Sequence, residues 1–190
     1  TAYGALTKMP KKIGNMTYYV QRNGKTIREF GYRYDTNENL IQEAFDTMLL
    51  AEHISGSGIV EMDYQQSPYN LLWCVRSDGE IAVLTRQVEE EVLSWTRVVT
   101  DGEFESVAVI PGDDDDDEVW VIVKRYINGS YVRYVEYFKP FDYGSEQEDA
   151  FFVDCGLSLD SPKVITGITK ANPGVVTCTG HGFSDGDIVI

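Results

Sequence analysis

The feature that most constrains the fold is a turn motif that recurs four times along the chain. An Asn-Gly or Asp-Gly pair separates two runs rich in β-branched and aromatic residues at positions 23–24, 78–79, 101–102 and 128–129. These dipeptides tolerate the positive φ angles of tight turns and are the strongest short-range signal for a β-hairpin. The four occurrences predict a mainly β protein built from antiparallel hairpins.

The hairpins group into a larger repeat. Trp73 and Trp120 lie 47 positions apart in similar surroundings, each within an apolar run that leads to a basic residue and then to a turn containing glycine. This spacing is close to the ~40–50-residue period of a β-propeller blade. We therefore expect propeller-like blades. One blade would have strands at about 59–65, 71–76, 80–86 and 92–99, and a second would begin at about 103.

The strand around Trp120 carries apolar residues on both of its faces. Val119, Val121 and Val123 alternate with Trp120 and Ile122. A strand of this kind is expected to be covered on both sides, as a blade is by its two neighbours. Trp73 and Trp120 are accordingly predicted to be core residues of equivalent strands. Two or three blades cannot close a ring that typically needs 4–8, so the propeller-like domain is expected to be incomplete.

One segment breaks the β pattern. Between Asn37 and Ile54, the apolar residues recur at helical spacing, at Ile41, Ala44, Phe45, Met48 and Leu49. Asn37 is a suitable N-cap. The pattern predicts a single amphipathic helix over about 38–53.

Three regions are expected along the chain. Residues 1–140 form the incomplete propeller-like domain, and 141–162 form a linker with one short strand at Phe151 to Val153. Residues 163–190 form the beginning of a small C-terminal β module, in which Ile188 to Ile190 would be an early strand. Because that strand would have no later partner, we expect the chain to be a piece of a longer protein.

Charge and cysteine usage exclude several classes of function. The net charge is −15, which disfavours sequence-independent binding to a phosphate backbone. Cys74, Cys155 and Cys178 are few, odd in number and widely spaced, so neither a disulfide framework nor a zinc ribbon is expected. No apolar run reaches the ~20 residues of a membrane span, and no signal peptide is apparent. The pattern indicates a chain made in a cytoplasm.

The acidic run from Asp113 to Glu118 is the most conspicuous candidate for a metal site. A calcium loop needs graded ligand spacing with an interior glycine, whereas this run has five consecutive aspartates and no interior glycine. We expect a mobile, solvated turn, with weak cation binding as the alternative. No metal site, cofactor or cofactor-binding residue is predicted.

No catalytic residues are predicted either. His53 and His181 have no paired cysteine with which to form a zinc site, and Cys74 lies within an apolar run. The phosphate-binding, dinucleotide-binding and nucleophile-elbow motifs are all missing from the sequence. The prediction is therefore that the chain is not an enzyme.

The aromatic residues allow two interpretations. Their regular placement within strands favours core packing, and a platform on which sugar rings stack is the alternative. The residues concerned are Trp73, Trp95, Trp120, Tyr131, Tyr134 and Tyr137.

Two segments resemble known families. The stretch from Ile59 to Phe138, with its "SPY", "LWCVRSDG", "ESVAVIP" and "VWVIVKR" motifs, resembles bacteriophage tail proteins of the nozzle or tail-tubular kind, in which such segments form propeller blades. The preceding "LLAEHI" is similar to a segment that these proteins carry. Separately, "ITGITKANPGVVTCTGHGFSDGDIVI" resembles the start of a small β-barrel named after the first catalytic-cysteine half-domain of ubiquitin-activating enzymes, which phage tail proteins carry as an accessory.

These resemblances imply a structural component of a phage or prophage tail. Such a protein would be made in the bacterial cytoplasm and located in the tail of the virion. It would assemble with copies of itself and with neighbouring tail proteins. The alternative is a module that binds host-surface carbohydrate. The catalytic activity behind the name of the small barrel is not implied, because no adenylation motif accompanies it.

Overall fold

The computed structural model describes residues 3–34, 40–88, 90–112, 116–142, 144–147, 150, 153–157 and 163–184. Every regular element of more than one residue in these ranges is a β-strand, and each pairing between neighbouring strands is antiparallel. The expectation of a mainly β, antiparallel protein is confirmed. The described residues divide into two compact units, Thr1–Asp154 and Cys155–Ile190.

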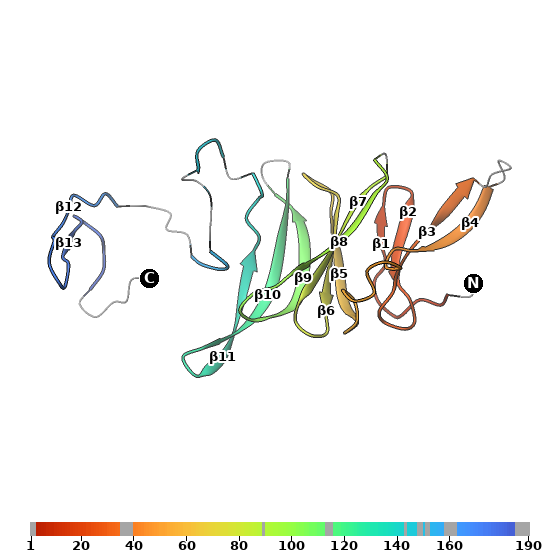
Figure 1. Cartoon of the computed structure of the whole chain (residues 1–190), viewed down its shortest axis with the longest axis horizontal. Helices are drawn as coiled ribbons and strands as arrows, with labels where there is room; N and C mark the ends of the chain where they lie inside the picture. The colour runs from red at the N-terminus through yellow and green to blue at the C-terminus, as the bar shows by residue number, and fades with distance from the viewer. Residues whose placement is uncertain are drawn as a thin grey trace. The chain divides into compact units, whose positions relative to one another are not determined.

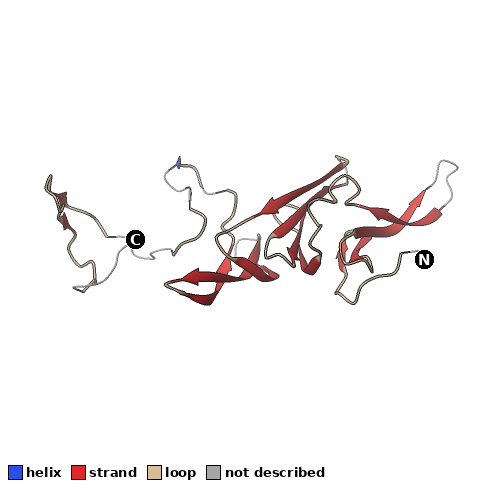
Figure 2. Ribbon diagram, turned by 60° about the horizontal axis from the view of Figure 1, so that its bottom comes forward, coloured by secondary structure: helices blue, strands red, loops and turns tan. Residues whose placement is uncertain are grey.

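The described residues of the first unit form three sheets, and each sheet follows the order of its strands in the sequence (Figure 1). Figure 2 shows the strands, in red, from a second direction. The first sheet comprises β1 (Lys11–Ile13), β2 (Met16–Val20), β3 (Ile27–Tyr34) and β4 (Leu40–Asp46). The second comprises β5 (Ile59–Gln65), β6 (Leu71–Arg76), β7 (Ile81–Gln87) and β8 (Val92–Val98). The third comprises β9 (Glu103–Pro111), β10 (Asp117–Ile127) and β11 (Ser130–Tyr137).

The strands of the second sheet lie within about one residue of the predicted ranges. Asp78-Gly79 forms the turn between β6 and β7, and Gly79 has a φ of 83°. Asn128-Gly129 joins β10 to β11 with φ angles of 51° and 83°, the two positive values that a type I′ turn requires. Asn23-Gly24 lies between β2 and β3. The fourth dipeptide, Asp101-Gly102, does not join two strands of one hairpin. It lies between β8 of the second sheet and β9 of the third, where the predicted strand ranges placed the boundary between two blades.

The second sheet is packed between the other two, and its β6 strand is buried on both faces. All six residues of β6 are buried. Leu72 and Cys74 join a core shared with the first sheet, which includes Tyr18 and Ile27. Trp73 joins a second core, shared with the third sheet. This double burial explains why β6 is a continuous apolar run and not an alternating one.

The first strands of the three sheets adjoin one another through carboxylates of β5. Glu61 accepts a hydrogen bond from the backbone N–H of Val107 (3.1 Å), and Asp63 accepts one from that of Val109 (2.9 Å). Asp63 also pairs with Lys11 of β1 at 2.7 Å. Side chains therefore satisfy backbone donors at the edge of β9 that no strand pairs.

The predicted helix over 38–53 is wrong where the structure describes it. Residues 40–46 form β4, which pairs with β3 from Tyr34↔Leu40 to Arg28↔Asp46, and turns follow. Among the residues with helical spacing, Met48 is buried, whereas Ile41, Phe45 and Leu49 are exposed, so the apolar stripe does not face a core. Pairing with the long β3 strand overrides the helical periodicity, and Ile and Phe are good strand formers. The expected N-cap, Asn37, lies outside the described residues.

The region after β11 contains no regular strand among its described residues until β12. Of the strand expected at Phe151 to Val153, the first two residues lie outside the described ranges and Val153 lies in a bend. The described residues of the second unit contain one hairpin, β12 (Gly167–Ile168) paired with β13 (Val176–Thr177). Ile188 to Ile190 lie outside the described residues.

Candidate interaction surface

The side of the third sheet that faces away from the second sheet presents a row of aromatic and aliphatic side chains. The register places four directly opposed pairs on this side, which we call the open face: Trp120↔Tyr137, Ile122↔Val135, Lys124↔Arg133 and Tyr126↔Tyr131. The alternate residues of β10, including Val119, Val121 and Val123, point into the core shared with the second sheet. The strand thus has one buried face and one face that no other sheet of the first unit covers.

The open face is equivalent to a face of the second sheet that is fully covered. Both first strands contain a bulge, at the step Ile59/Glu61 in β5 and opposite Ile122/Val123 in β9. Next to the bulges, Val75 of β6 and Ile122 of β10 are the corresponding residues. Trp73 and Trp120 each lie two residues before them and therefore occupy the same position in their sheets. The prediction that the two tryptophans lie on equivalent strands is therefore consistent with the register.

The two equivalent faces differ greatly in exposure. Ile81 is completely buried, whereas its counterpart Val135 is 70% exposed. Val83 is 4% exposed and its counterpart Tyr137 40%. Trp73 is buried against Phe138 with ring centroids 4.8 Å apart, whereas Trp120 is only partly buried. The prediction that Trp120 is a core residue is wrong for the first unit, because no further described sheet of that unit covers Trp120 as the third sheet covers Trp73.

The aromatic rings of the open face associate in pairs. Trp120 packs on Tyr137 at a centroid distance of 5.1 Å, and Tyr126 packs edge-on against Tyr131 at 5.0 Å. Tyr134 points to the opposite side of β11 and is also exposed. Core packing, the favoured interpretation of the aromatic residues, holds for Trp73 and Trp95. It fails for the tyrosines of β11.

The polar groups of the open face are paired within the same sheet. Lys124 binds Glu103 at 3.0 Å, and Arg133 binds Glu105 at 2.6 Å. The hydrogen bond from Arg133 holds the pKa of Glu105 below its ordinary value. Trp120 Nε1 donates to Glu118 at 2.8 Å. Lys124 and Arg133 therefore each have a carboxylate partner, and the third carboxylate, Glu118, accepts from the indole N–H of Trp120.

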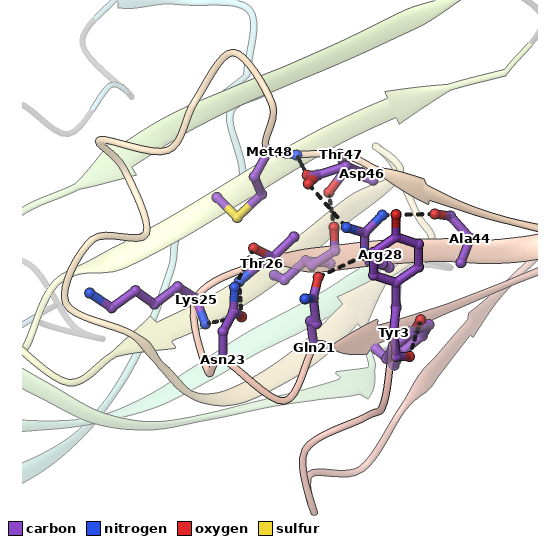
Figure 3. A network of polar contacts seen from close by, with 12 residues as sticks. Tyr3, Gln21, Asn23, Lys25, Thr26, Arg28, Ala44, Asp46, Thr47 and Met48 are labelled. Carbon is purple, nitrogen blue, oxygen red and sulfur yellow. Dashed lines mark hydrogen bonds and ion pairs between the residues drawn. The ribbon is translucent and has the colours of Figure 1, made fainter. Parts of the chain in front are cut away.

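The outward side of the first sheet, at the other end of the stack, has a different character. Figure 3 shows Arg28 at its centre, with the guanidinium donating to Gln21 (2.7 Å) and to the carbonyl oxygen of Ala44 (2.9 Å). The guanidinium also lies 3.7 Å from the centre of the Tyr3 ring and 3.5 Å from Asp46. This polar network thus covers the part of the side around Arg28, while Tyr32 and Leu40, which the register places on the same side, are 63% and 58% exposed.

A buried ionic cluster joins the first and second sheets. Glu29 of β3 is almost fully buried and accepts hydrogen bonds from Tyr18 (2.6 Å) and from Arg86 of β7 (2.9 Å). Burial, reinforced by the neighbouring Glu29 carboxylate, raises the pKa of Tyr18 above its ordinary value. The cluster is structural, because its members satisfy one another within a core.

The acidic run is ordered at its C-terminal end. Asp117 belongs to β10, and its carboxylate accepts hydrogen bonds from the backbone N–H groups of Gln66 (2.6 Å) and Ser67 (3.0 Å). Asp116 accepts one from the Ser67 hydroxyl at 2.9 Å. Asp116 and Asp117 are therefore hydrogen-bonded to the loop between β5 and β6. The prediction of a mobile, solvated turn is wrong for these two residues. Residues 113–115 lie outside the described ranges.

The histidines and cysteines remain scattered. His53 is exposed in a turn, and His181 stacks on Phe183 at 5.6 Å between two glycines of positive φ. Burial raises the pKa of Cys74 far above its ordinary value, which disfavours the thiolate. Within the described ranges, no three His, Cys, Asp or Glu residues gather where they could hold a metal ion. The same ranges contain no helix with the length and apolarity that a bilayer span requires.

Comparison with known proteins does not identify the chain. No protein-family model matches it, and no curated protein matches it significantly.

Proposed function

We propose that the chain is a structural component of a phage or prophage tail and acts through protein–protein assembly, not catalysis. The observation that carries the proposal is that the open face of the third sheet is apolar and exposed. Its residues occupy the positions that, in the second sheet, form the face packed against the third sheet. A large exposed apolar patch of this kind is typical of an interaction site.

Two further observations support the proposal. The segment from Ile59 to Phe138, which resembles nozzle-type tail proteins, coincides with the second and third sheets. Successive sheets also adjoin by their first strands, with Asp63 bonded to both of the other sheets, an arrangement expected of neighbouring propeller blades. In this proposal the two sheets are blades of an incomplete propeller, and the partners are copies of the chain and neighbouring tail proteins.

The test is the protein composition of tail particles. Particles would be purified from cells that carry the gene, and their proteins would be identified and counted by mass spectrometry. We expect the protein in a fixed ratio to the other tail proteins. Its absence from intact particles would refute the proposed function. Neighbouring genes that encode portal and tail proteins would add support.

A host-surface carbohydrate module is the second candidate, and the exposed Tyr126–Tyr131 pair favours it. Aromatic rings at a surface provide stacking platforms for sugar rings. Titration with host-surface glycans, followed by calorimetry, would reveal saturable binding that Tyr131→Ala abolishes. Tyr32→Ala is the matched control, because Tyr32 is equally exposed on the first sheet. A lack of saturable binding would remove this candidate.

A further inference from the structure

We propose that Asn128, at the tip of the β10–β11 hairpin, is a site of spontaneous deamidation, whereas Asn23, in the turn between β2 and β3, is protected by its hydrogen bonds. The sequence contains two Asn-Gly pairs, at 23–24 and 128–129. A glycine after asparagine leaves its backbone nitrogen open to contact by the asparagine side chain, because glycine has no Cβ. The inference concerns the chemistry of these two turns and does not rest on the proposed function.

The reaction needs only water and a solvent base. The backbone nitrogen of Gly129 gives its proton to the base and forms a bond with Cγ of Asn128, and the bond between Cγ and Nδ2 breaks. Nδ2 takes a proton from water and leaves as ammonia, so the product is a cyclic imide. Water then opens the imide at either of its two carbonyl carbons. One opening gives aspartate, and the other gives isoaspartate, in which the main chain runs through the side-chain Cβ and Cγ atoms.

The turn at Asn23 holds the reacting groups in other contacts. Figure 3 shows the side-chain Oδ1 of Asn23 accepting from the backbone N–H groups of Lys25 and Thr26, each at 3.0 Å. The leaving group, Nδ2, donates to Thr26 Oγ1 at 2.9 Å. The attacking group, the Gly24 N–H, donates to the carbonyl oxygen of Gln21 at 2.8 Å. Attack at Asn23 therefore requires that hydrogen bonds of the turn break first.

The turn at Asn128 leaves the same groups available. Asn128 and Gly129 are both exposed, with φ angles of 51° and 83°. Within the described part of the chain, no group forms a hydrogen bond with the Asn128 side chain, and none accepts from the Gly129 N–H. The hydroxyl of Ser130 donates to the carbonyl oxygen of Ile127 instead, at 3.4 Å. Solvent therefore reaches both the attacking nitrogen and the side-chain amide.

Deamidation changes one end of the open face. Tyr126 and Tyr131, whose ring centroids are 5.0 Å apart, form the second ladder pair from this turn. Either product places a new negative charge near them. Isoaspartate also lengthens the main chain of a turn in which two successive residues have positive φ angles. The charge and the geometry of this end of the open face therefore change as the protein ages.

The experiment follows deamidation in the full folded chain during incubation at mildly alkaline pH. Digestion after aromatic residues places the two sites on separate peptides, Val20–Phe30 and Ile127–Tyr131. Chromatography and mass spectrometry then give the fractions of asparagine, aspartate and isoaspartate at each site. We expect Asn128 to react roughly tenfold faster than Asn23, because only Asn23 must first break hydrogen bonds. Equal rates, or a faster reaction at Asn23, would overturn the inference.

Two controls separate the effect of the fold from that of the local sequence. In urea, where both turns lose their hydrogen bonds, the two rates should become similar; a difference that persists unchanged would overturn the role of the hydrogen bonds. Asn128→Gly removes the reacting amide and keeps a residue that adopts a positive φ. Ion-exchange chromatography of the intact chain should show the wild type gaining an acidic form that this variant lacks. If the variant gains it as fast as the wild type, Asn128 is not the site.

Discussion

Truncation of the two equivalent tryptophans provides a direct test of the relation between the second and third sheets. Trp73 and Trp120 occupy the same ladder position, but only Trp73 is covered by a further sheet. Trp73→Ala and Trp120→Ala should therefore have unequal effects on the free energy of unfolding. The comparison is internal to one chain, so the two variants control for each other.

The expected cost of Trp73→Ala follows from its contacts. The side chain is 4% exposed and packs against Phe138, and its Nε1 donates to Gln65 Oε1 at 3.1 Å. Removal of a buried aromatic residue costs about 3–5 kcal/mol. The lost hydrogen bond leaves the buried Gln65 oxygen without this donor, which places the cost towards the upper end of that range.

The expected cost of Trp120→Ala is smaller. Its ring packs against that of Tyr137, and such a pair contributes about 0.5–1.5 kcal/mol beyond the area that it buries. With some loss of buried area, we expect a cost of about 1–2 kcal/mol, because the Trp120 side chain is only partly buried.

The assay is urea unfolding followed by circular dichroism, at a concentration low enough to keep the chain monomeric. Equal costs for the two variants would refute the argument that Trp73 is covered and Trp120 is not. Costs in the reverse order would refute the register equivalence as well.

Three further predictions concern single side chains, and urea unfolding measures each of them. Glu29→Ala should cost about 3–5 kcal/mol, because it leaves the partly buried Arg86 without its carboxylate partner. Glu105→Ala, which breaks an exposed ion pair, should leave the midpoint of unfolding almost unchanged, and equal effects of the two variants would contradict the structural role of the cluster. Asp117→Ala should cost about 1–3 kcal/mol through the loss of two backbone hydrogen bonds to a carboxylate, and an unchanged midpoint would show that the loop between β5 and β6 does not depend on it. The raised pKa of Tyr18 contributes stability that is present below the unfolded-state pKa of about 10 and is lost as the pH rises above it; Tyr18→Phe should flatten this alkaline decline, and an equally steep decline would contradict the assignment.

The sequence predicts well the parts of the fold that local patterns determine. The turns at Asp78-Gly79 and Asn128-Gly129 require positive φ angles, and the continuous apolar run of β6 requires cover on both sides, so local chemistry is sufficient for both. The segment from Leu40 to Asp46 fails because its state depends on a partner distant in sequence. It pairs with β3, and helical spacing of apolar residues carries no information about an available strand edge.

The candidate surface depends on tertiary information in the same way. The alternation of Val121 with Trp120 and Ile122 predicts that both faces of β10 are apolar, which is correct. It cannot predict that one of these faces has no sheet beside it within the described first unit. Asp117 illustrates a further limit, because a run of aspartates does not indicate which of them meets the backbone of a loop about 50 residues earlier in the chain.

The carboxylates of Glu61 and Asp63 have a mechanical consequence. Where β5 meets β9, the joint between two sheets is made by side chains and not by a ladder of backbone hydrogen bonds. Side chains can rotate by small amounts while keeping an N–H donor within reach, whereas a backbone ladder moves as one rigid piece. We therefore expect the angle between the second and third sheets to be fixed mainly by their shared apolar core, and less strictly than the angles between strands of one sheet.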